Sequence, residues 1–248
     1  MRILLLLALA FACPADAATP RPKKNSTPRP TASVPSPAAA KPKATPVPET
    51  SPAATPKPDR APNASLEPGA LAEFSRQPER VQQLLTTALA LTTRGLTYTY
   101  GSADPGQGGM DCSGTIHHLL VSSGFQEVPR DSSGQYAWVR KAGGFRAVVS
   151  KSAESFEFSE LLPGDLLFWT GTYSVEREIP ITHVMLYLGT EQKTRKRVMF
   201  GASDGRSYAG LQRWGVSVFD FKMPRLDPAN PEQTKVDFVG YGRIPGLR

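Results

Sequence analysis

Cysteine and histidine are scarce in this 248-residue chain, which has two cysteines and three histidines. Cys13 lies in an N-terminal leader, so the rest of the chain has Cys112 alone and cannot form an internal disulfide. One cysteine and three histidines give no metal-ligand spacing. We therefore expect neither a metal nor an organic cofactor.

Long hydrophobic runs are also missing, apart from one at the N-terminus. Ile3 to Phe11 is apolar, and Ala15-Asp16-Ala17 is typical of a cleavage site. A run this short predicts a removable signal peptide over residues 1–18 and no transmembrane segment. We expect an exported protein, periplasmic or extracellular and associated with the cell envelope. The residues before Cys13 loosely resemble a bacterial lipoprotein acylation site, so a lipid anchor there is the alternative.

Residues 19–63 have almost no large apolar side chains and few acidic ones. Between residues 19 and 62, eight Lys and Arg stand against Glu49 and Asp59, and thirteen prolines prevent helix. This composition predicts a disordered basic linker, because too little apolar surface is present to offset chain entropy. From residue 63 onward 20 basic and 19 acidic residues nearly balance, so most of the net charge of +7 belongs to the linker. The charge therefore gives no support for nucleic-acid binding.

Residues 64–248 are long enough to form a single domain with one core. Apolar spacing predicts a helix from Pro78 that ends before Gly95, and a second over 115–121 with Gly124 as its C-cap. A short helix is expected after Pro129. An apolar run at 166–169 follows a predicted turn, and strand candidates come after it at 182–188, 197–202, 216–221 and 236–241. Helices followed by an antiparallel meander predict an α+β fold, and we expect a monomer.

Cys112 lies at or just before the N-terminus of the second predicted helix. Free backbone N–H groups and the helix dipole favour a thiolate at such a position. A lone cysteine there is either a buried small hydrophobe or a nucleophile. In an exported protein an unpaired cysteine is a liability unless it is sheltered or used, which favours the nucleophile.

A thiol nucleophile needs a base within hydrogen-bond reach. His117 and His118 share the helix of Cys112 and are rotated away from it, so we interpret them as surface or half-buried residues. His183 begins a predicted strand, and a strand end facing a helix N-terminus is a reasonable place for a base. A strand histidine is also often structural, so this pattern alone leaves both roles open.

Five ordered blocks resemble the NlpC-type cell-wall cysteine peptidases and together cover most of residues 78–203. They are Tyr98-Thr99-Tyr100-Gly101, Asp111-Cys112-Ser113-Gly114, Pro129-Arg130 with Ser132 and Gln135, Leu162 to Phe168, and His183 to Gly189. The resemblance implies a compact papain-like fold and hydrolysis of an amide in peptidoglycan stem peptides, commonly the bond from D-glutamate to a diamino acid.

The same resemblance implies roles for individual residues. Cys112 becomes the nucleophile and His183 the general base, with the Tyr98 hydroxyl beside the thiol as an oxyanion or substrate donor. Three polar side chains match positions that hold the amino end of the substrate in some members: Asp111, Ser113 and Ser132. Each residue also has an ordinary structural interpretation, as a cap, a first-turn or turn residue, or a core aromatic.

The third catalytic position of the family, a polar residue that orients the histidine, falls on Gly201. Strand alternation places Ser203 on the same face as Gly201, whereas Asp204 needs a bulge to turn inward. Ser203 is our candidate and Asp204 its alternative. A backbone carbonyl or a water holding His183, or a slow or inactive enzyme, are the remaining outcomes. Because the third group mainly orients the imidazole, we expect activity to survive.

Two other functions stay open on the sequence. A non-catalytic cell-wall-binding module is favoured by Gly201 and opposed by the intact pair of Cys112 and His183. An amidase or acyltransferase of the same fold would act on another amide or ester. Two insertions stand out: we expect 171–181 to border the cleft and the basic segment 191–197 to form a solvated hairpin tip.

Overall fold

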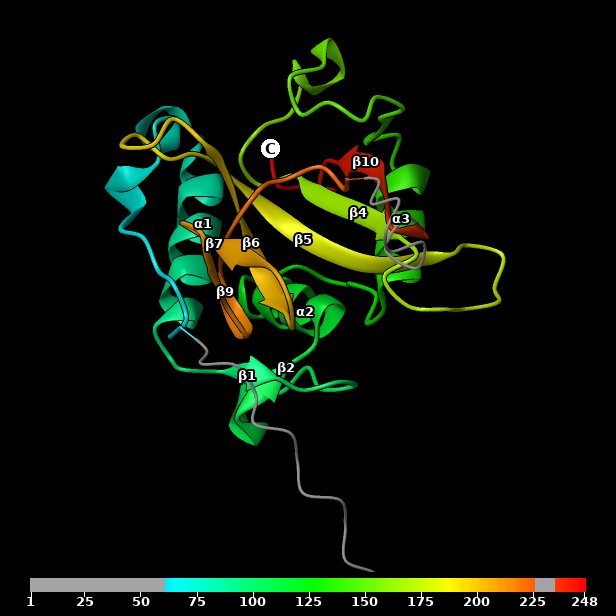
Figure 1. Ribbon diagram of the computed structural model, residues 1–248, viewed down its shortest axis with the longest axis horizontal. Helices are drawn as coiled ribbons and strands as arrows, with labels where there is room; N and C mark the ends of the chain where they lie inside the picture. The colour runs from blue at the N-terminus through cyan, green and yellow to red at the C-terminus, as the bar shows by residue number, and fades with distance from the viewer. Residues whose placement is uncertain (1–60, 226–234) are drawn as a thin grey trace, which may run out of the picture. The chain divides into compact units, whose positions relative to one another are not determined.

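The computed structural model describes residues 61–225 and 235–248 (Figure 1). The predicted signal peptide, Cys13 and nearly all of the predicted linker lie outside these residues. Within the described ranges, no helix has the length and apolar character that crossing a bilayer requires.

Three α-helices form in the predicted regions, two from apolar spacing and one after Pro129: α1 (Glu79–Thr92), α2 (Cys112–Ser122) and α3 (Ser132–Lys141). Pro78 precedes the first residue of α1, and the buried stripe of this helix includes Val81, Leu84, Leu85 and Ala88. Gly124 follows α2 with a φ of 83°, a left-handed conformation that glycine adopts without strain. The prediction of these helices is confirmed.

Six strands form one antiparallel sheet in the order β3-β10-β4-β5-β6-β9. Their bounds are Phe145–Ala147 (β3), Leu166–Thr170 (β4), Ile181–Thr190 (β5), Arg197–Ser203 (β6), Gly215–Asp220 (β9) and Asp237–Gly242 (β10). Two small pairs stand apart from this sheet. Thr97–Tyr98 (β1) runs parallel to Gly109–Met110 (β2), and Ser207–Tyr208 (β7) pairs with Leu211–Gln212 (β8).

The expected α+β class is confirmed, but the sheet is not a simple meander. Strands β5, β6 and β9 follow one another as predicted and β4 forms from the apolar run at 166–169, whereas β10 returns to pair with β4 and adds β3 beyond it. The apolar residues Leu166, Leu167, Phe168 and Trp169 of β4 are fully buried. A strand buried on both faces is a central strand that needs partners on both edges, and β10 supplies the second edge.

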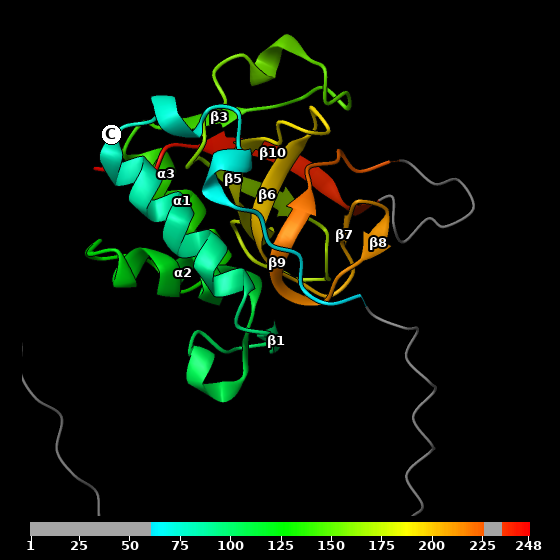
Figure 2. The same ribbon diagram turned by 90° about the vertical axis from the view of Figure 1, so that its left-hand side faces the viewer.

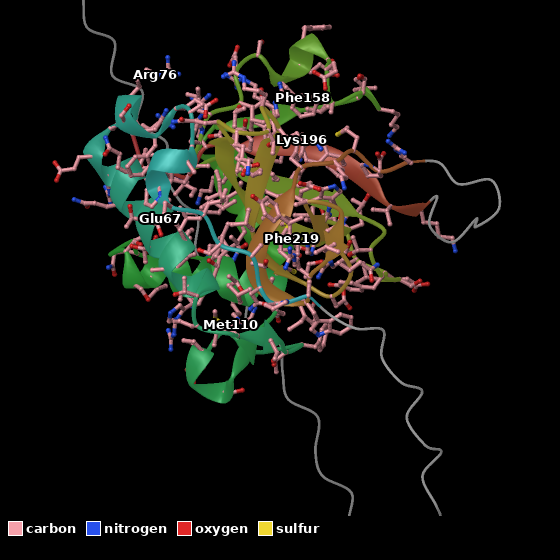
Figure 3. All side chains as sticks on the ribbon, turned by 60° about the vertical axis from the view of Figure 1, so that its left-hand side comes forward. Glu67, Arg76, Met110, Phe158, Lys196 and Phe219 are labelled. Atoms are coloured by element: carbon pink, nitrogen blue, oxygen red, sulfur yellow. The ribbon has the colours of Figure 1, made fainter. Side chains whose placement is uncertain are left out.

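The two faces of the sheet have separate cores. The helix-side core includes Leu166, Val184, Phe200 and Val218 with the apolar faces of α1 and α2, which lie on one side of the sheet in Figure 2. The far-side core includes Trp169, Met185, Met199 and Phe219, covered by Phe158 from a short 3-10 helix (Phe156–Phe158). Figure 3 labels Phe158 near the top of the domain and Met110, just before α2, near the bottom.

Strands β5 and β6 separate at one end. Their pairs run from Thr190↔Arg197 to Leu186↔Phe200. Beyond that point the start of β5 pairs with β4, and the end of β6 pairs with β9 as far as Ser203↔Gly215. Helix α2 contacts both strands. The opening between them therefore frees backbone and side-chain groups of β5 and β6 for a site.

Candidate functional site

Asp111 caps α2 and fixes its first turn. Its Oδ1 accepts hydrogen bonds from the Gly114 N–H at 2.6 Å and the Ser113 hydroxyl at 3.3 Å, and its Oδ2 accepts from the Gly101 N–H at 2.9 Å. Arg130 donates to both oxygens, at 3.1 and 2.9 Å. The carboxylate thus has five hydrogen bonds within the domain and is 7% exposed. In the structure this carboxylate is the N-cap of α2. Contact of Asp111 with a substrate ammonium stays a prediction.

Cys112 is the first residue of α2, and its side chain is buried, with 6% exposed. Burial raises the pKa of the thiol to about 11, and the Asp111 carboxylate adds to the rise. Hydrogen bonds from the backbone N–H groups of Val184, Ser113 and Cys112 lower the pKa but do not offset burial. The bond from Val184 brings the sulfur to β5, one residue from His183.

His183 lies in β5 and is 7% exposed, with its ring 5.6 Å from that of Trp169. Its Nε2 accepts a hydrogen bond from Nε of Arg206 at 3.3 Å. Burial first, and the Arg206 guanidinium second, hold the pKa of His183 well below its usual range. The imidazole is therefore neutral at pH 7.

The thiol and the imidazole are both uncharged in this arrangement. The helix N-terminus favours a thiolate at Cys112, but the structure shows that desolvation outweighs its N–H groups. The predicted roles of Cys112 as nucleophile and His183 as general base stay predictions. With both groups neutral, those roles require the thiol proton to be removed during attack on a substrate.

A cavity of about 830 Å³ opens beside His183. Its lining includes Tyr98, Tyr100, Tyr173, His183, Ser203 and Arg206. Burial raises the pKa of Tyr98, and so does the negative charge that Cys112 carries when ionised. Tyr98 thus lies within electrostatic reach of the thiol, and its role as an oxyanion or substrate donor stays a prediction. Thr172 and Tyr173 come from the 171–181 insertion, which borders the cavity as expected.

The first turns of α2 and α3 are held in place by hydrogen bonds of the side chains of Ser113, Ser132 and Gln135. The Ser132 hydroxyl donates to the Ile181 carbonyl at 2.8 Å, and the Ser113 hydroxyl accepts from Arg130 at 3.1 Å. Gln135 is fully buried, and its Nε2 donates to the carbonyls of Ser113 at 3.0 Å and Pro129 at 2.9 Å. Substrate contacts by Ser113 and Ser132 stay predictions, because both hydroxyls already have partners.

The other two histidines are half-buried on α2. The Nδ1 of His117 lies 3.0 Å from the Val128 carbonyl, so this ring helps to join α2 to the segment after it. Across the part of the chain that the structure describes, no group of three or more His, Cys, Asp or Glu side chains is arranged to hold a metal ion.

These features match a known family over the central part of the chain. A family model, described as the NlpC/P60 family, matches residues 95–206, which include the cap, the thiol, the imidazole and the strands that hold them. The chain carries an NlpC/P60 domain. Members of this family are cell-wall peptidases or amidases. A search of curated proteins found no match.

Gly201, where the sequence resemblance places the third catalytic residue, has no side chain to orient an imidazole. A Cβ atom at Gly201 would lie 3.0 Å from Cε of Met185, so the Met185 side chain already fills the space that a polar residue would need. Ser203 is buried and lines the cavity with His183, and Asp204 is exposed at its rim. Among the described residues, neither forms a hydrogen bond with His183. Their roles stay predictions.

The group that does contact the imidazole of the NlpC/P60 domain is Arg206, which sequence reasoning missed. It lies three residues past the end of β6, in the turn before β7, and its guanidinium carbon is 4.3 Å from the centre of the Trp169 ring. An arginine in a predicted turn gives no sign that it folds back onto a buried histidine. The contact between Arg206 and His183 depends on the pairing of β6 with β5, which the sequence around Arg206 does not indicate.

Proposed function

We propose that this protein is an exported cysteine peptidase that hydrolyses an amide bond in peptidoglycan stem peptides, between D-glutamate and a diamino acid. Residues 1–18 direct export, 19–63 form a basic linker, and 64–248 carry the activity. One observation supports this proposal most strongly. Cys112 begins a helix in an NlpC/P60 domain, and its buried thiol accepts a hydrogen bond from the residue after His183, which lines a cavity.

In the proposed reaction, His183 removes the proton of the Cys112 thiol as the sulfur attacks the scissile carbonyl. The tetrahedral intermediate carries a negative oxygen. The N–H of Cys112 at the start of α2 and the Tyr98 hydroxyl are the donors available to stabilise it. Collapse of the intermediate breaks the C–N bond, and His183 returns the proton to the leaving amine. Water then hydrolyses the thioester and regenerates the thiol.

The test is the release of soluble fragments from purified peptidoglycan by the wild-type protein beside Cys112→Ala and His183→Ala. The proposal expects peptide fragments from the wild type alone, and their masses identify the bond. Release by either variant at the wild-type rate contradicts the assigned roles. Circular dichroism of each variant separates lost chemistry from lost folding.

A cell-wall-binding module is the second candidate, and two observations favour it. Gly201 removes the polar residue that orients the histidine, and the Arg206 guanidinium lowers the basicity of His183. Retained binding to the sacculus by a wild-type protein that releases no fragments would make this second function the better one.

A further inference from the structure

Arg206 is set apart from the other described arginines by its contact with His183, and it has no carboxylate partner among residues 61–225 and 235–248. Arg130, Arg146 and Arg243 form ion pairs with Asp111, Glu160 and Asp165. The side chain of Arg206 is half-buried, stacks on Trp169 and donates to His183. Burial lowers the pKa of its guanidinium to about 10, which still leaves it charged at pH 7. A half-buried cation without an anion is poorly compensated, so this position is suited to binding one.

The bond from Arg206 to His183 cannot persist through the proposed reaction. Nε2 accepts this bond, so the neutral ring carries its proton on Nδ1. Once His183 has taken the thiol proton, both ring nitrogens carry hydrogen and neither can accept. The guanidinium and the imidazolium then repel each other. Arg206 therefore needs a different acceptor while the reaction proceeds.

The position of Arg206 indicates which half of the substrate supplies that acceptor. Cys112 holds the acyl half as a thioester, whereas His183 delivers a proton to the leaving amine and so lies against the leaving half. Arg206 contacts the same ring and lines the same cavity as His183. Its guanidinium is thus placed towards the leaving half. A carboxylate there could form two charge-assisted hydrogen bonds, which are stronger than the single bond to a neutral nitrogen.

We propose that Arg206 is a specificity residue that binds a carboxylate on the leaving diamino acid, exchanging His183 for this carboxylate when substrate binds. The proposal rests on the proposed peptidase function and narrows its substrates to peptides whose leaving residue carries a free carboxylate near the scissile amide. The bound carboxylate would also raise the pKa of His183, because it neutralises the guanidinium charge that lowers this pKa.

The experiment uses four otherwise identical stem peptides that end in diaminopimelate, with both carboxylates of that residue free, either one amidated, or both amidated. Wild-type protein is expected to lose roughly 10- to 100-fold in kcat/KM when the carboxylate that Arg206 binds is amidated. In Arg206→Gln the ratio between free and amidated peptides falls to about one. Arg206→Lys keeps part of the ratio, because a lysine supplies charge without the planar fork. Arg195→Gln, on the β5–β6 turn, is the matched control and keeps the full ratio.

Affinities of the same peptides for Cys112→Ala and for Cys112→Ala with Arg206→Gln separate this proposal from the proposed function. Tighter binding of the free carboxylate that depends on Arg206, without any cleavage by the wild type, supports the carboxylate site and contradicts the peptidase. If free and amidated peptides are cleaved with the same kcat/KM and bound with the same affinity, the proposed role of Arg206 is wrong. A ratio that survives in folded Arg206→Gln overturns it as well.

Discussion

Helices α2 and α3 begin with nearly the same four residues, Asp-Cys-Ser-Gly at 111–114 and Asp-Ser-Ser-Gly at 131–134. In both, the aspartate is the N-cap and accepts a hydrogen bond from the glycine N–H three residues later, at 2.6 Å in α2 and 3.0 Å in α3. Both helices also contact β5. The local chemistry that starts the two helices is therefore shared.

The residues after the two caps differ in what β5 presents to them. The Ser132 hydroxyl meets the Ile181 carbonyl, an acceptor, so its proton is held in a structural hydrogen bond. The Cys112 sulfur meets the Val184 N–H, a donor, which leaves the thiol proton free to be removed. The capped helix start thus positions the side chain of its first residue. Whether that side chain can lose its proton depends on the backbone group that the facing strand presents to it.

The largest expected effect comes from making the two helix starts identical. Cys112→Ser gives the start of α2 the same four residues as the start of α3. We expect peptidoglycan hydrolysis to fall on the order of 10⁴-fold or more, because a serine next to a neutral histidine of low basicity is a poor nucleophile. Ser132→Ala is the matched change in α3. Fragment release measured under one condition compares the two. An equal loss in both variants would show that the comparison of the two starts has no bearing on catalysis.

A second prediction concerns the protonation of Cys112 in the free protein. With a thiol pKa of about 11, the thiolate fraction should rise about tenfold for each pH unit between 7 and 10. In the described part of the chain, no charged group around this thiol holds Cys112 as a thiolate at pH 7. The titratable and charged groups nearby are Asp111, Tyr98, His183 and Arg206. Alkylation of Cys112 by iodoacetamide, located by mass spectrometry, should follow this slope without a plateau below pH 10.

The control for the alkylation experiment is His183→Ala. Because His183 is neutral at pH 7, its removal should change the slope little in the absence of substrate. A plateau near pH 7 that disappears in His183→Ala would instead reveal a preformed thiolate–imidazolium pair, and the helix N-terminus of α2 would then outweigh burial after all.

The sequence predicts these elements well where the signal is local. The stripe containing Val81 and Leu85 identifies α1, and a glycine at 124 marks the end of α2. The order of the motifs brings the candidates Cys112 and His183 to one site. The position of β10 beside β4 was not predicted, because pairing between strands distant in the chain leaves no periodicity to read. Arg206 was missed for the same reason: its contact with His183 spans 23 residues and a turn.

The smallest expected effect distinguishes the two caps by stability. Asp111→Ala removes the cap of α2 and the bidentate pair with Arg130, and we expect a loss of about 2–3 kcal/mol in the free energy of unfolding. This is less than a fully buried pair would give, since the Arg130 side chain is 36% exposed and water screens the remaining charge. Asp131→Ala removes the cap of α3, which accepts hydrogen bonds from the N–H groups of Ser133 and Gly134 near the surface. We expect a loss of about 1 kcal/mol in the free energy of unfolding.

Urea unfolding at pH 7 measures both losses. Equal losses would mean that Arg130 adds nothing to the α2 cap, and that the ion pair with Asp111 does not hold the start of the cysteine helix in place.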